Sequence, residues 1–285
     1  MTTASIVIPV FNRANLVHRA LDSALTQTHP CEVLLVDHGS TDEIASVVRQ
    51  YGDRIRYVRR EIDQGPIVCW RDGIEHATGE IVHITYDDDW ISPTFMERCL
   101  ALLRDDVGLV YTGVVLHQTE DGCEVPLFSH PCGVRPVAGL VHYLLRNRLT
   151  ISPGCAVFRR RDALANLLSE VPGATGPYGK NSGVGEDLLL FLLATLSYPR
   201  YAHEPARLAH FLAHAGSITI DAVSSGKGRE IEAAYARAKD YYLRQPGALQ
   251  PLKGTASLIE RCRWAASSRT LMHQVWKRLR WRRRR

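Results

Sequence analysis

Apolar, strand-like runs and helical segments alternate four times within the first 110 residues, and this alternation limits the possible folds more than any other feature. The runs are apolar on both faces, which is typical of strands covered by helices on both sides of a sheet. A fifth run covers residues 107–117. We therefore expect an α/β fold with a doubly wound, mostly parallel sheet flanked by helices. The first four runs are SIVIPV (5–10), VLLVD (33–37), IRYVRRE (55–61) and EIVHITY (80–86).

Acidic side chains follow two of these runs, at the point where each strand is expected to end. Asp37 closes the second run, and three consecutive acids, Asp87, Asp88 and Asp89, follow the fourth. A charged turn that caps the next helix would explain either group alone. Ligands of such sheets bind at the carboxyl ends of the strands, and hard oxygen ligands suit Mg²⁺ or Mn²⁺. Two acidic groups on one edge therefore favour a metal or nucleotide site.

The second half of the chain carries weaker signals. Residues 183–196 predict a glycine-bearing loop that leads into an apolar helix, with Glu186 and Asp187 in the first turn of the helix. Acids at this position stabilise the helix dipole, which is the purely structural explanation for them. The other patterns are typical of a hairpin arm (122–128), a helix (140–147) and a turn followed by a short strand and a helix start (152–164).

Cysteine usage and hydropathy bear on the compartment. The seven cysteines are scattered and form no Cys-x-x-Cys pair, which favours buried thiols in a reducing compartment over disulfides or a zinc site. No apolar stretch is long enough to span a bilayer, and no basic segment precedes the apolar run near the N-terminus. We expect a cytoplasmic protein.

Basic charge is concentrated at the C-terminus. The last nine residues, KRLRWRRRR, hold seven of the 35 basic side chains and no acid, which leaves 28 basic against 30 acidic residues in the rest of the chain. Apolar residues recur at helical intervals before and within this tail, which is typical of a basic amphipathic helix on an anionic membrane surface. A nucleic-acid-binding tail and a solvated terminus are the rival interpretations. The apolar positions are Trp264, Leu271, Met272, Val275, Trp276 and Leu279.

Five segments follow one another along the chain: SIVIPVFNR, EVLLVDHGSTD, DQGPIVCWRDGIEHATGEIVHITYDDDWISP, GED (185–187) and FLAHAGSIT (211–219). In order and spacing, they together resemble the family 2 glycosyltransferases, which are nucleotide-sugar-dependent enzymes with the GT-A fold. The resemblance runs from Ser5 to Thr219 and implies a GT-A-like domain over residues 1–221, followed by a helical, basic extension over 222–285.

The resemblance implies a role for each matching residue. Asp187, with Glu186 beside it, matches the general base that takes the proton of the acceptor hydroxyl. Asp87, Asp89 and His214 match the groups around a bound Mn²⁺ or Mg²⁺. The positions that match the nucleotide-sugar site are Pro9, Phe11, Asn12, Asp37, Gly65, Arg71, Asp87 and Asp88.

Glycosyl transfer explains why such a site needs both a cation and a base. The leaving diphosphate gains negative charge, which a divalent ion neutralises, and the acceptor hydroxyl is a weak nucleophile that needs a base. The family implies inversion at the anomeric carbon and, most often, bacterial surface polysaccharide or glycolipid assembly. We expect a nucleoside-diphosphate sugar as donor, with a UDP-sugar favoured, and a saccharide or lipid-linked acceptor at the inner face of the plasma membrane. We do not expect nucleic acid as a partner.

Several positions depart from the family pattern or have a simpler explanation. His38 stands where relatives carry a second acid and fills its space. Arg71 follows Cys69 and Trp70 where many relatives carry Ala-Arg-Asn, and it is a phosphate ligand or a solvated helix residue. Asp88 is the alternative to either member of the Asp87 and Asp89 pair.

His214 has two interpretations, a ligand or a packed histidine. Trp90 also has two, a residue that stacks on a sugar or a residue of the core. A sugar-nucleotide pyrophosphorylase is a rival enzyme, but residues 8–15 (IPVFNRAN) lack the glycine-rich loop that it needs. A non-catalytic protein that binds a sugar nucleotide or nucleic acid is the rival from another class, and the intact Asp87, Asp89 and Asp187 argue against it.

Overall fold

The computed structural model describes residues 2–118, 124–126, 131–146, 149, 151–173, 182–214 and 226–248. Its strands are β1 (Ala4–Val10), β2 (Glu32–His38), β3 (Arg56–Arg60), β4 (Ile81–Ile84), β5 (Trp90–Ile91), β6 (Val107–Gln118), β7 (Glu124–Pro126), β8 (Gly133–Pro136), β9 (Ala156–Arg159) and β10 (Arg200–Ala213). Its α-helices are α1 (Val17–Leu25), α2 (Ile44–Tyr51), α3 (Pro66–His76), α4 (Phe95–Leu102), α5 (Val137–Leu145), α6 (Arg160–Asn166), α7 (Glu186–Ala194) and α9 (Gly228–Leu243). Short 3₁₀ turns cover Gly52–Arg54 and Pro153–Cys155.

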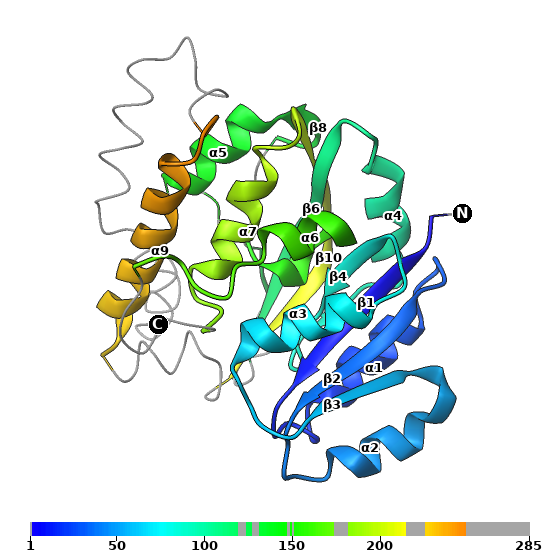
Figure 1. Cartoon of the computed structure of the whole chain (residues 1–285). Coiled ribbons are helices and arrows are strands. Elements are labelled where there is room, and N and C mark those ends of the chain that lie inside the picture. The colour runs from blue at the N-terminus through cyan, green and yellow to red at the C-terminus, as the bar shows by residue number, and fades with distance from the viewer. Residues whose placement is uncertain are drawn as a thin grey trace, which may run out of the picture.

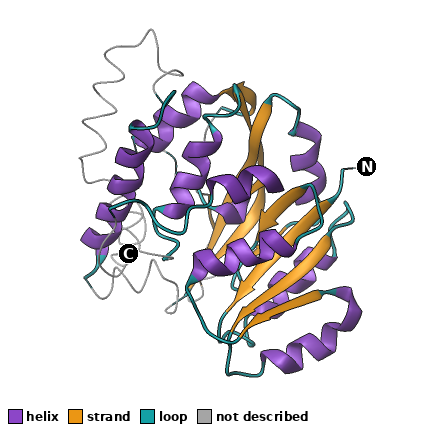
Figure 2. Cartoon of the chain, viewed as in Figure 1, coloured by secondary structure: helices purple, strands orange, loops and turns teal. Residues whose placement is uncertain are grey.

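One sheet joins these strands in the order β3-β2-β1-β4-β9-β6-β10-β5. The first four strands are parallel, as the sequence predicts, and β6 and β10 are also parallel to each other. The strand β9 runs antiparallel between β4 and β6, and β7 adds the predicted hairpin arm to β6. Helices cover both faces of the strands (Figure 2). The predicted α/β, GT-A-like sheet is confirmed.

Close packing of α3 on the sheet explains one glycine of this helix. A Cβ at Gly73 would lie 2.2 Å from Cγ1 of Val7 on β1 and 3.0 Å from Cγ2 of Val36 on β2. Figure 1 shows α3 crossing in front of these strands, with α1 behind them. Both strands are therefore buried on both faces, and their carboxyl ends hold the loops that carry the candidate site.

The long strand β10 was not predicted from the sequence. Its sequence is rich in Ala, His and Arg, which are not strong strand formers, and it contains Pro205. The pairing of β10 with β6 shifts register between Glu204 and Arg207, so Pro205 sits at an irregularity rather than in the ladder. Proline is unfavourable in a central strand, and this irregularity explains why Pro205 is tolerated in β10.

The C-terminal part of the described chain is the helix α9, which packs beside α7 (Figure 1). Ile231 and Ala234 of α9 form a small apolar cluster with Val184, which lies just before α7. No helix in the described part of the chain is both long and apolar enough to cross a membrane. The basic tail at 277–285 lies outside the described residues.

Candidate functional site

The turn between β4 and β5 places three carboxylates at the carboxyl edge of the sheet. Asp87 and Asp89 are buried, with 8% and 7% of their surface exposed, and Asp88 is partly exposed. Arg13, from the loop after β1, donates to Oδ1 of Asp87 at 3.1 Å and to Oδ2 of Asp88 at 2.8 Å. The backbone N–H of Leu212 on β10 donates to Oδ1 of Asp89 at 2.9 Å. The cluster therefore joins β1, β4 and β10.

Burial disfavours the charged form of Asp87 and Asp89. Burial raises the pKa of Asp87 to about 7, although the charge of Arg13 lowers it. Burial, and then the charge of Asp88, raises the pKa of Asp89 well above its ordinary value. An added cation would favour the ionised form of each carboxyl, so the residues present fit a divalent metal.

His214 completes the cluster from the end of β10. Its Nε2 lies 2.9 Å from Oδ2 of Asp88, and a fifth of its side chain is exposed. Within the described residues, no group of three or more His, Cys, Asp or Glu side chains forms a ready-made cation cage. A metal held by one or two protein carboxylates would take its other ligands from a bound diphosphate or water.

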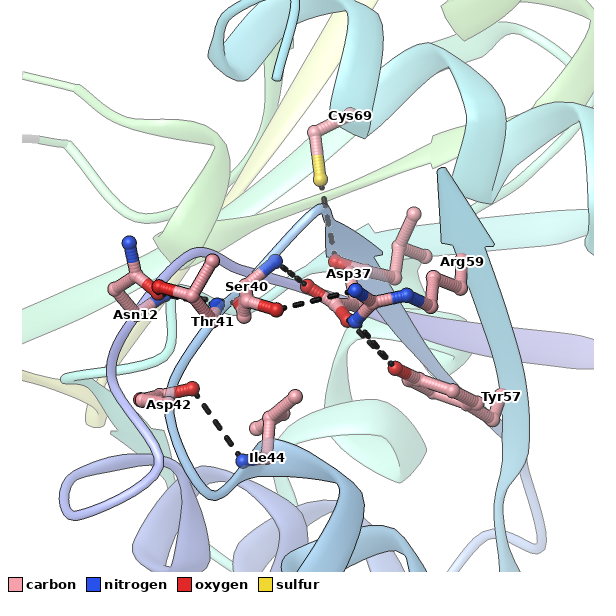
Figure 3. Close-up of polar contacts among 10 residues, drawn as sticks. Asn12, Asp37, Ser40, Thr41, Asp42, Ile44, Tyr57, Arg59 and Cys69 are labelled. Carbon is pink, nitrogen blue, oxygen red and sulfur yellow. Dashed lines mark hydrogen bonds and ion pairs between the residues drawn. The ribbon is translucent and has the colours of Figure 1, made fainter. Parts of the chain in front are cut away.

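Asp37 organises the loop after β2 (Figure 3). It is fully buried; its Oδ1 accepts from the N–H of Ser40 at 2.8 Å, and its Oδ2 accepts from the Tyr57 hydroxyl at 2.5 Å and from Arg59. Burial alone would raise its pKa, but the hydrogen bonds from Ser40 and Tyr57 and the charge of Arg59 lower it. Asp37 thus holds the loop through contacts that already use both of its oxygens.

The loop after β1 is tied to the loop after β2. The N–H of Asn12 donates to Oγ of Ser40 at 2.9 Å, and Oδ1 of Asn12 accepts from the N–H of Thr41 at 2.8 Å. Asn12 has a φ of 53°, a left-handed conformation that asparagine tolerates. Beside it Phe11 is 44% exposed, which is unusual for an aromatic side chain and leaves an apolar surface at this edge of the sheet.

Pro9 and Gly65 lie next to these loops. Pro9 is on β1 opposite Val36, beyond the point at which the pairing of β1 with β4 ends at Val7, so no ladder hydrogen bond to β4 is lost. Gly65 precedes α3 with a φ of 92°, and its N–H donates to Oδ1 of Asp63 at 2.8 Å. Both residues shape the backbone around the nucleotide site that the sequence predicts.

His38 takes part in a charged network rather than only filling space. It is 1% exposed, with Nε2 3.3 Å from Oδ2 of Asp72 and Nδ1 3.5 Å from Oδ1 of Asp63. Asp72 also pairs with Arg60 through both of its oxygens. His38 therefore links the end of β2 to α3 and to the loop before it.

Arg71 is the predicted nucleotide-site residue that the structure does not bring together with the others. Its NH1 donates to the carbonyl oxygens of Leu164 and Leu167, each at 3.2 Å, and its Nε pairs with Oε1 of Glu75 at 2.9 Å. The guanidinium thus satisfies carbonyls at the end of α6. These contacts give Arg71 a structural role.

Asp187 and Glu186 begin α7 but differ in exposure. Asp187 is partly exposed, whereas Glu186 is 1% exposed. Oδ1 of Asp187 accepts from the N–H groups of Gly185 and Leu188, and its Oδ2 accepts from the Tyr235 hydroxyl at 3.0 Å. Burial raises the pKa of Asp187 to about 6 and that of Glu186 to about 7. Asp187 is therefore the more accessible and the more readily ionised of the two.

Tyr86 connects the two acidic groups. It directly precedes Asp87, and the charges of Asp187 and Asp89 add to burial in raising its pKa. Its ring lies 5.5 Å from that of Trp70, against which the loop before α7 packs. One acid from each group, Asp89 after β4 and Asp187 on α7, thus lies near Tyr86.

The ring of Trp90 packs against basic and aromatic side chains. The guanidinium of Arg19 lies 4.3 Å from the centre of its ring, and the ring of His210 stacks at 5.3 Å. His210 in turn contacts Ser92 at 2.9 Å and His117 at 3.0 Å. Trp90 is partly exposed and lies outside the apolar core, so stacking on a sugar stays a prediction.

Sequence reasoning missed Arg13 and Tyr235. Arg13 is a single basic residue in a loop, and Tyr235 lies 48 residues beyond Asp187 on a helix with no motif. The sequence offered only two indications of such residues. Three adjacent acids need positive charge nearby, and a buried carboxylate needs hydrogen-bond donors.

Comparison with known proteins identifies the family. The model of Glycosyl transferase family 2 matches residues 5–166, which is more than half of the chain. The chain belongs to this family of glycosyltransferases. Curated relatives include uncharacterized glycosyltransferases of Rickettsia prowazekii (36% identical over 117 residues, 39% of this chain) and of Escherichia coli, YibD (30% over 105 residues, 36% of this chain). The matches cover only 36% and 30% of those two proteins, and 18% of a relative in Rickettsia felis.

Solved structures share the fold of this family 2 glycosyltransferase. Staphylococcus aureus TarS 1–349, in complex with UDP-GlcNAc, superimposes with a TM-score of 0.66 at 17% identity, over 91% of this chain and 72% of TarS. The mannosyltransferase PcManGT of Pyrobaculum calidifontis, in complex with GDP-Man and Mn²⁺, gives 0.58 at 17% identity, over 96% and 78%.

We predict that Arg71→Met lowers the free energy of unfolding by about 1–2 kcal/mol, because two carbonyls lose a charged donor, and leaves UDP affinity unchanged. Urea denaturation and calorimetry measure the two quantities. Glu75→Gln is the matched control: it breaks only the exposed ion pair, which contributes about 0.3–0.5 kcal/mol. Weaker UDP binding by Arg71→Met, with stability unchanged, would instead place Arg71 at the donor.

Proposed function

We propose that this family 2 glycosyltransferase moves a sugar from a nucleoside-diphosphate sugar to an acceptor hydroxyl with inversion at the anomeric carbon. One observation carries the proposal: Asp89 after β4 and Asp187 on α7, about 100 residues apart, both lie near enough to Tyr86 for their charges to raise its pKa. Transfer needs these two functions side by side, since a leaving diphosphate needs positive charge and an acceptor needs a base.

The donor would bind along the carboxyl ends of β1, β2 and β4. Phe11 and Ile62, which are 44% and 71% exposed, offer apolar surface for a nucleobase at the ends of β1 and β3. Asp37 and Asn12 hold the loops between them in place. UDP is the favoured nucleotide, and the complexes of TarS with UDP-GlcNAc and of PcManGT with GDP-Man support a nucleoside-diphosphate sugar.

Asp89 and Asp87 would hold Mn²⁺ or Mg²⁺, with Asp88 and His214 beside them. When bound, the metal would neutralise charge on the leaving diphosphate. The Mn²⁺ complex of PcManGT supports this choice of cofactor. The guanidinium of Arg13 already pairs with Asp87 and Asp88. Its positive charge would also stabilise the leaving diphosphate.

Asp187 would act as the base on the acceptor side. It is partly exposed, and its carboxylate takes the proton from the acceptor hydroxyl while that oxygen attacks the anomeric carbon from the face opposite the diphosphate. Glu186 is buried and cannot reach an acceptor without rearrangement. It would tune the charge of Asp187 rather than replace it.

We predict that Asp187→Asn lowers turnover by about 10²- to 10⁴-fold, the usual cost of losing a general base, and leaves donor affinity unchanged. In the unaltered enzyme, turnover should rise with pH through about 6, because the base must be ionised. Release of nucleoside diphosphate, with the donor chosen by a thermal-shift screen with Mn²⁺, measures turnover. Loss of donor binding in Asp187→Asn would place Asp187 in the nucleotide site instead.

We further propose that the acceptor is a saccharide or a lipid-linked saccharide of surface polysaccharide or glycolipid assembly. The enzyme would then work from the cytoplasm, against the inner face of the plasma membrane. The uneven distribution of charge along the chain supports this location. Residues 1–276 carry 28 basic and 30 acidic side chains and would not themselves be attracted to anionic lipid. The tail at 277–285 would provide the attraction.

We predict that removing residues 276–285 sharply reduces sedimentation with anionic vesicles and leaves turnover on a small saccharide acceptor nearly unchanged. Salt should release the full-length protein, because exposed charges are screened over about 10 Å at 0.1 M ionic strength. RNA is the comparison ligand at the same ionic strength. A preference for RNA, or vesicle binding that survives truncation, would contradict the membrane assignment.

A further inference from the structure

Tyr235 contacts the proposed base from a helix outside the part of the chain that matches the family model, residues 5–166. Its hydroxyl donates to Oδ2 of Asp187 at 3.0 Å. The other oxygen of Asp187 is held by the N–H groups of Gly185 at 2.9 Å and Leu188 at 2.7 Å. The backbone of α7 therefore fixes one oxygen of the carboxylate, and α9 fixes the other.

Packing holds Tyr235 in place along α7. A Cβ at Gly185 would lie 3.0 Å from the carbonyl oxygen of Ala234, the residue before Tyr235, so the two chain segments touch at the start of α7. Toward the other end, the hydroxyl of Tyr242 on α9 lies 3.1 Å from Oγ1 of Thr195, just after α7. The two helices are thus joined near both ends, and the hydroxyl of Tyr235 has a defined position.

The hydrogen bond affects both the direction and the ionisation of the carboxylate. A donor to Oδ2 restricts rotation about the Cβ–Cγ bond and stabilises the charged form. This opposes burial, which raises the pKa of Asp187. Among the described residues, Glu186 on its own helix and Tyr86 from the end of β4 also face Asp187, and neither is a cation. Tyr235 is therefore well placed to keep the base oriented and ionised.

We propose that Tyr235 is a positioning residue that holds Asp187 toward the acceptor, so that α9 forms part of the catalytic machinery. The inference rests on the proposed role of Asp187 as the general base. It extends the functional unit beyond residue 221, where the sequence places the end of the GT-A-like domain.

The test compares Tyr235→Phe with Tyr242→Phe in the full chain. Both changes remove one buried hydroxyl from α9, but only the first removes a contact with Asp187. The pKa of Asp187 is measured by ¹³C NMR on protein labelled at the aspartate carboxyl carbons, with Asp187→Asn to assign the signal. We expect Tyr235→Phe to raise this pKa by about one unit, since a hydrogen bond to a charged group contributes about that much. Tyr242→Phe should lower thermal stability without moving the pKa.

Turnover provides the second measurement, as UDP released from UDP-GlcNAc with Mn²⁺ and water or a saccharide as acceptor. For Tyr235→Phe, the rising limb of the pH profile should shift upward by the same amount, with UDP affinity unchanged. A titration and a pH profile that match those of the unaltered enzyme would overturn the inference, as would an equal shift in Tyr242→Phe. Full turnover in Asp187→Asn would overturn the proposed base itself, whereas an inactive Asp187→Asn with an unshifted Tyr235→Phe would overturn only the role of Tyr235.

Discussion

Three adjacent carboxylates at the end of β4, two of them buried, are the constraint on which the candidate site depends. Like charges held together away from water raise one another's pKa unless a positive partner is present. Arg13, the N–H of Leu212 and His214 provide part of the compensation. Because these groups come from the loop after β1 and from the end of β10, the balance of charge connects the β1–β4 half of the sheet to its far side.

The acids of α7 occupy a different environment, and this separates the two functions. Among the described residues, the hydrogen-bond partners of Asp187 are backbone N–H groups and a phenol, where the acids after β4 pair with a guanidinium. Such an environment leaves its pKa near 6, which suits a group that must accept a proton near neutral pH. The cluster after β4 suits a cation, and the α7 site suits a base.

The features predicted most reliably from the sequence are those that burial and strand order determine. The runs of β1 to β4 are apolar on both faces because helices cover both, and their alternation with helices left one arrangement for their carboxyl ends. The acids at those ends were found because Asp is a poor strand former in an apolar run.

Other features depend on contacts that local sequence does not encode. The strand β10 has weak strand propensity and is stabilised by its partner β6, with Pro205 placed where the register shifts. Arg71 could equally have faced a phosphate; only the position of α6 shows that it binds the carbonyls of Leu164 and Leu167. Tyr235 carries no motif, and its role follows from the packing of α9 on α7.

Nucleotide binding with and without metal tests most directly whether the acids after β4 form a site for a metal-bound diphosphate. Calorimetric titration of UDP, and of GDP in parallel, requires neither the sugar nor the acceptor to be known. We expect Mn²⁺ to raise the affinity of at least one nucleotide by about tenfold or more, or about 1.4 kcal/mol, and Asp89→Asn to abolish that gain. Equal affinity with and without Mn²⁺ in the unaltered protein would contradict the proposed site.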